Sequence, residues 1–153
     1  MPTEQIGVIF DKVNRFTEGL VKKITLDTHA NLVANPHSTD TGTPVDTGFA
    51  SSNWVPRVGA PFTEQAGSRP TSRGDINAKA IGDDSKKNFG ALDYGPQEDG
   101  KVQVAGYRLA MGNCFVSNNV PYIQPLNNGS SKQQPAGFVE RAIAKALFED
   151  IRQ

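Results

Sequence analysis

The sequence predicts an α+β fold with a long N-terminal helix, a small antiparallel β-sheet with a long inserted loop, and a C-terminal helix packed on the sheet. Three observations lead to this prediction. Apolar residues recur every three or four positions near the N-terminus and again after Gly137, which is typical of amphipathic helices. Between Val102 and Val116 the apolar residues follow a period of two, which is typical of strands. The length of 153 residues suits one domain, 1–153.

The first helix is predicted from Thr3, which can cap it, to about Ala34, because Pro36 disfavours helical geometry at Asn35. A helix of about 30 residues is about 45 Å long, whereas a compact chain of this size is roughly 40 Å across. We therefore expect the helix to break near Gly19 or to extend beyond the globule. Its apolar stripe consists of Ile6, Ile9, Phe10, Val13, Phe16, Leu20 and Ile24.

The predicted strands lie in the second half of the chain. Val102 and Val104 alternate in one phase and Tyr107 to Met111 in the other, which indicates a bulge at Gly106. The pair Gly112-Asn113 suits a hairpin turn between these residues and the segment CFVSNN. A β-meander followed by the C-terminal helix is the expected order.

Two segments have the composition of loops. Residues 36–48 are small, polar, Gly or Pro, and Asp46 or Thr47 could cap a brief helical turn after them. Residues 59–100 are rich in Gly and Pro and predict a long loop or arm, in which 75–81 suggests a helical turn.

Charge and composition exclude several classes of function. Sixteen basic residues balance sixteen acidic ones, which disfavours tight, nonspecific binding to nucleic acid. The single cysteine, Cys114, excludes an intrachain disulfide, and His29 and His37 lack the spacing of metal ligands. We expect no metal and no cofactor. No apolar run is long enough to span a membrane and no secretory signal is evident, so synthesis in the cytoplasm is expected.

One motif suggests an enzyme. The segment from Asp46 to Pro56, DTGFASSNWVP, is similar to the active-site stretch of pepsin-like aspartic proteases. Their chemistry needs two carboxylates that share a proton, each following a buried strand. The residues before Asp46 are polar, and a second Asp-Thr-Gly at Asp40 lies on the same loop. An aspartic-protease-like enzyme is therefore the alternative, and a structural protein is favoured.

Two stretches of the chain, PVDTGFASSNW (44–54) and YIQPLNNGSSKQQPAGFVERAI (122–143), together resemble the neck and tail-completion proteins of long-tailed bacteriophages. They cover 33 of the 153 residues, and the order of long helix, strands and final helix also matches. Two positions depart from the family pattern, Ala50 and Asn53. The residues that carry the resemblance are Pro44, Asp46, Gly48, Trp54, Tyr122, Gly129, Pro135, Gly137 and Phe138.

The resemblance implies a structural virion protein without catalytic residues. Such a protein assembles as a hexameric or dodecameric ring at the head-tail junction, where it finishes the tail and joins it to the head connector. Its expected partners are copies of itself, the head-connector protein, the tail-tube or tail-terminator protein, and genomic DNA that passes through without specific binding. A tail-assembly factor that does not remain in the virion is a further alternative.

Overall fold

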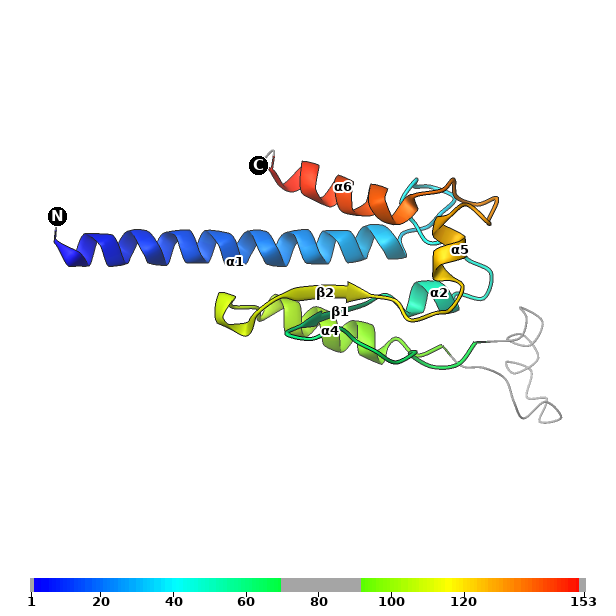
Figure 1. Ribbon diagram of the computed structural model, residues 1–153, viewed down its shortest axis with the longest axis horizontal. Coiled ribbons are helices and arrows are strands. Elements are labelled where there is room, and N and C mark those ends of the chain that lie inside the picture. Colours follow the sequence, from blue (N-terminus) through cyan, green and yellow to red (C-terminus); the bar gives the residue numbers. More distant parts are fainter. Residues whose placement is uncertain (1, 70–91, 152–153) are drawn as a thin grey trace.

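The computed structural model describes residues 2–69 and 92–151 of the chain (Figure 1). It confirms the α+β class, with a long N-terminal helix, a two-stranded antiparallel sheet and a C-terminal helix. In chain order the described elements are α1 (Thr3–Val33), α2 (Phe49–Ser52), β1 (Val55–Val58), α4 (Gly95–Ala105), the 3-10 turn η1 (Leu109–Met111), β2 (Cys114–Ser117), α5 (Ile123–Asn127) and α6 (Phe138–Ile151).

Helix α1 is continuous over 31 residues and passes through Gly19 without a break. The predicted cap Thr3 is the first helical residue, and Pro2 occupies the cap position. At the other end Ala34 is extended, as expected for the residues leading into Asn35-Pro36. The helix therefore extends beyond the body of the protein, which is gathered around its C-terminal half (Figure 1).

The remaining elements form layers around this half of α1. Strands β1 and β2 lie on one side of α1, and α4 contacts β1 (Figure 1). Helix α6 lies on the other side and runs antiparallel to α1. The strands are antiparallel, with Val55 opposite Ser117 and Val58 opposite Cys114. The core cluster joins α1, α6 and the sheet through Leu32, Trp54, Phe138 and Ala142, with Val33, Val116, Ile123, Leu126 and Val139 packed against it.

The predicted meander over Val102 to Met111 is wrong. Most of that segment forms α4 and η1, and the strand that pairs with β2 is β1, which precedes the Gly-rich region. Helix α4 begins with Gly95-Pro96, and Pro is favoured in the first helical turn. Its inner face consists of Gln97, Gly100 and Val104. Because this face carries a single large apolar side chain, helical periodicity was hidden in the sequence.

Gly100 allows α4 to lie close to the sheet. A Cβ atom at this position would collide with the carbonyl group of Pro56 in β1. The predicted hairpin turn at Gly112-Asn113 is wrong: Gly112 has a φ of 92°, but the two residues join η1 to β2. The amide of Gly59, just after β1, donates to the carbonyl of Asn113 at 2.8 Å and closes that end of the sheet.

The predicted arm over 59–100 is shorter on its C-terminal side, because α4 begins at Gly95. The N-terminal part of the arm contacts the rest of the protein through Ala66, whose amide donates to Asn53 Oδ1 at 2.6 Å. The next residue, Gly67, forms an isolated antiparallel β-bridge with Leu92. The predicted helical turn at 75–81 lies outside the described residues.

Trp54 is buried, with 6% of its surface exposed, at the point where the loop after α1 enters the sheet. Its indole Nε1–H donates to the Thr43 hydroxyl at 2.7 Å, and this hydroxyl donates to the carbonyl of Leu32 at 2.7 Å. The carbonyl of Trp54 lies 3.0 Å from His29 Nε2, which donates to it in the neutral tautomer with hydrogen on Nε2.

Replacing Trp54 with Ala should lower the free energy of unfolding by about 3–5 kcal/mol, because it leaves a large cavity in the core. Trp54→Phe keeps an aromatic ring but removes the donor to Thr43, and should cost about 1–2 kcal/mol. Urea denaturation followed by circular dichroism would measure both values. Equal stability of Trp54→Ala and the wild type would contradict the core role of this side chain.

The stability of the fold should also depend on the protonation of His29. Desolvation lowers the pKa of His29; Lys101 acts in the same direction, while the bond to Trp54 and the charge of Glu98 oppose it. The unfolded chain binds this proton near pH 6.5, and the folded chain binds it at a lower pH. The stabilisation is therefore complete above about pH 6.5 and is lost as the pH falls toward the folded pKa. Melting temperatures at pH 7.5 and 5.5 should show this loss in wild type and in His37→Gln, and a smaller loss in His29→Gln.

Candidate functional site

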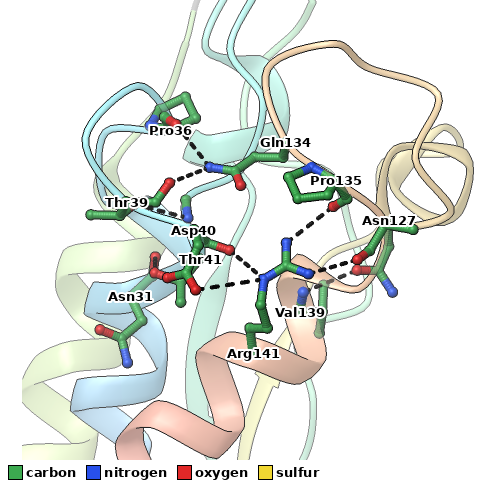
Figure 2. A network of polar contacts seen from close by, with 12 residues as sticks. Asn31, Pro36, Thr39, Asp40, Thr41, Asn127, Gln134, Pro135, Val139 and Arg141 are labelled. Carbon is green, nitrogen blue, oxygen red and sulfur yellow. Dashed lines mark hydrogen bonds and ion pairs between the residues drawn. The ribbon is translucent and has the colours of Figure 1, made fainter.

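The two stretches that carry the resemblance lie against each other, although 67 residues, 55–121, lie between them in the sequence. Gln133 is bonded twice to the main chain of Val45: its Oε1 accepts from the amide and its Nε2 donates to the carbonyl, both at 2.8 Å. The buried Gln134 donates from Nε2 to the carbonyls of Pro36, at 2.9 Å, and Thr39, at 2.6 Å (Figure 2). The loop after α1 and the loop before α6 are thus joined by glutamine amides.

Arg141, in the first turns of α6, adds a second set of bonds to this junction. Its Nε donates to the carbonyl of Asp40 at 2.7 Å, and its two terminal nitrogens donate to the carbonyls of Ala136 and Pro135 (Figure 2). The carboxylate of Asp40 lies 4.0 Å from Arg141 Nε. The planar guanidinium therefore binds three main-chain oxygens from two loops and fixes the start of α6 against the end of α1.

Asn127 holds the turn that leads into α6. Its Oδ1 accepts from the amide of Val139 at 3.0 Å, its carbonyl accepts from the amide of Gly137 at 2.7 Å, and its Nδ2 donates to Glu140. This last bond lowers the pKa of Glu140. Gly129 and Gly137 have φ values of 91° and 83°, which favour glycine. The two motif glycines are therefore explained by the shape of the turn.

Four other motif residues surround a small cavity. Pro44, Asp46, Gly48 and Tyr122 line a space of about 130 Å³, together with Arg69 and other residues. The guanidinium carbon of Arg69 lies 4.7 Å from the centroid of the Tyr122 ring. Burial raises the pKa of Tyr122, and Arg69 acts in the opposite direction. The volume would hold one side chain and is well below the roughly 300–1,000 Å³ of small-molecule sites.

Gly48 has a φ of 84° and occupies the cap position of α2, where Asp46 or Thr47 was predicted. The Thr47 hydroxyl accepts a long bond, 3.5 Å, from the amide of Phe49. Asp46 is exposed at the rim of the cavity. Its neighbour there is Tyr122, whereas Asp40 lies beside Arg141. The two Asp-Thr-Gly carboxylates therefore have different surroundings.

All nine motif residues thus have an observed position. Trp54 and Phe138 meet in the core, four residues line the cavity, and Pro135, Gly129 and Gly137 shape the loop before α6. Sequence reasoning missed the residues that join the loops, namely Asn127, Gln133, Gln134 and Arg141. All four lie within the matched stretch 122–143, but their residue types alone suggest an ordinary polar surface.

The other candidate site is the N-terminal half of α1. Its apolar residues are exposed, with fractions from 40% at Ile6 to 72% at Phe16. Single exposed apolar residues are common, whereas a contiguous group marks an interaction surface. We call this group the bare stripe; it consists of Ile6, Ile9, Phe10, Val13 and Phe16.

Within residues 2–69 and 92–151, no group of three or more His, Cys, Asp or Glu side chains is placed to hold a metal ion. None of the described helices combines the length and the hydropathy needed to cross a membrane. Burial raises the pKa of the half-buried Cys114 thiol, the opposite of what activates a nucleophilic cysteine.

Comparison with known proteins gives no match: no protein-family model, no curated protein and no solved structure is similar to this chain.

The glutamine junction predicts a specific loss of stability. Gln134→Ala should lower the free energy of unfolding by about 1–3 kcal/mol, because the carbonyl of Pro36 loses its donor in a buried position. Gln124→Ala, the same change at an exposed position of α5, should shift it by less than about 0.5 kcal/mol. Urea unfolding of both variants tests this, and equal stabilities would contradict the role of Gln134.

Proposed function

We propose that this chain is a structural protein that acts by assembling with other protein chains, as a ring at the head-tail junction of a long-tailed bacteriophage. The bare stripe carries the proposal. Five large apolar side chains on one helix are held away from the body, where they add nothing to the core. Such a surface suits binding to another protein.

The phage assignment has a second support. The two stretches that resemble neck and tail-completion proteins form one unit, joined by the bonds of Gln133 to Val45 and by the packing of Trp54 and Phe138 in one core cluster. Their glycines, proline and aromatic residues have roles in turns and packing. The motif residues therefore serve the shape of the fold and need no catalytic role. This favours the structural protein over the aspartic-protease-like alternative.

The proposal predicts that the chain is present in the virion at a ring-like copy number. Quantitative mass spectrometry of purified particles from the phage that encodes it should give about six or twelve copies, the numbers expected of a hexamer or dodecamer. Cryo-electron microscopy of the neck should place this ring between the head connector and the tail.

Two outcomes would contradict the proposal. If particles need the chain in order to form but do not contain it, the tail-assembly factor is supported instead. The Asp46→Asn variant is the control for the enzyme: particles carrying it should form in normal yield. Loss of a proteolytic activity in this variant, with normal assembly, would favour the protease.

A further inference from the structure

The bare stripe continues the face of α1 that α6 covers. Near the C-terminal end of α1, Asn31 Nδ2 donates to the carbonyl of Ala142 in α6 at 3.1 Å, so this position faces α6. Successive members of the series Ile6, Val13, Leu20 and Asn31 are seven, seven and eleven residues apart, which is about two or three helical turns each. They therefore lie on the same side of α1. One stripe runs along the helix, and α6 covers only part of it.

The length of the uncovered part follows from helix geometry. Helix α6 runs antiparallel to α1 and continues for nine residues beyond Ala142, to Ile151 (Figure 1). Both helices rise by the same distance per residue. Because Asn31 lies opposite Ala142, the end of α6 lies beside about residue 22 of α1. The part from Thr3 to about residue 21 is therefore free of α6 and is about 28 Å long.

The spacing within the bare stripe indicates what kind of partner it binds. Four of its residues, Ile6, Ile9, Val13 and Phe16, are separated by alternating steps of three and four residues, and the half-buried Leu20 continues the series. This is the a and d pattern of a heptad repeat, which forms the seam between two helices. The expected occupant is therefore a helix of similar length.

We propose that the bare stripe binds the bare stripe of a second copy of this chain, with the two α1 helices antiparallel. The inference rests on the proposed function, in which the bare stripe binds a protein chain, and concerns the free protein before it enters the ring. In a parallel pair, both bodies would lie at the same end, and the α6 helices of the two chains would compete for the space between the α1 helices. In an antiparallel pair the bodies lie at opposite ends, and each α1 fills the segment that the other chain's α6 leaves open.

The register of this pair follows from the stripe itself. If the midpoints of the two stripes lie side by side, Ile6 lies opposite Phe16 of the partner subunit, and Ile9 lies opposite Val13 of the partner subunit. Each a position then meets a d position, as the seam requires. The pairing also places the largest side chain, Phe16, beside an aliphatic one. In a parallel pair, Phe16 would meet its own copy.

The area involved is sufficient for a specific dimer. Side chains of these types expose roughly 100–200 Å² each when free, so the stripe offers on the order of 500 Å² per chain. A symmetric pair then buries about 1,000 Å², the threshold for a specific interface. Because a two-fold pair is closed, this dimer is the form of the free protein, distinct from the ring in the virion.

The first test measures the mass of the free full-length protein. Size-exclusion chromatography with light scattering should give twice the chain mass of 16.5 kDa. Val13→Asp, on the stripe, should halve the measured mass. Val8→Asp is the matched control, because Val8 is exposed to 53% and Val13 to 55%, but Val8 lies about 140° around the helix. It should remain a dimer, and both variants should keep the wild-type melting temperature of the body.

The second test measures orientation by disulfide formation in a Cys114→Ser background. An equimolar mixture of differently tagged Ile9→Cys and Val13→Cys chains should form a crosslinked heterodimer on oxidation. Either variant alone should crosslink poorly, because identical positions are then more than about 7 Å apart. Efficient crosslinking of each variant with itself would indicate a parallel pair and overturn the proposal.

A monomeric wild type, or a dimer that persists in Val13→Asp and is lost in Val8→Asp, would also overturn it. These results concern the free protein, whereas the ring is tested by the copy number in particles. Failure of one proposal is therefore distinguishable from failure of the other.

Discussion

The carbonyl oxygen of Leu32, in the last turn of α1, is the point on which the rest of the fold depends. It accepts two hydrogen bonds from Thr43, one from the amide at 2.9 Å and one from the hydroxyl at 2.7 Å. The same hydroxyl accepts from Trp54, whose carbonyl in turn contacts His29, one turn back on α1. The unpaired carbonyl at a helix end is thereby used to fix both the loop and the start of the sheet.

This arrangement attaches the body to one end of a helix. The glutamine junction, Arg141 and the core around Phe138 all gather at the C-terminal end of α1. The N-terminal half contributes little to them, so within this chain its stability comes mainly from helix propensity. In proteins most helical stability comes from the packing of an apolar face rather than from propensity. A partner helix along the bare stripe would supply the packing that this segment lacks within its own chain.

The sequence predicted α1, α6 and the class of the fold because long apolar stripes need little context. It failed for β1, a strand of four residues that contains Pro56, and for α4, whose inner face is built from Gln97 and Gly100. In both cases, contact between the two elements determines the structure: glycine permits the approach of α4 to β1. Such a long-range fit leaves no periodic signal.

The candidate site was predictable to a similar degree. The residues that carry the resemblance include Gly48, Gly129 and Gly137, which have positive φ in the structure, and Trp54 and Phe138, which are packed in the core. The amide bonds of Gln133 and Gln134 were not predictable, because a glutamine in a polar loop has many possible partners. Which main-chain groups it meets depends on how α1 and α6 bring two distant loops together.

The distribution of residue types along α1 is the reverse of what a monomer needs. Its buried residues are Thr28, His29 and Leu32, two of them polar, at the covered end. His29 has a specific role there, because its Nε2 bonds the carbonyl of Trp54. The uncovered end faces solvent, where polar side chains are expected, but it carries Phe10 and Phe16. Apolar surface that is placed where the chain cannot bury it itself stabilises an assembly, because its transfer from water occurs when a partner binds.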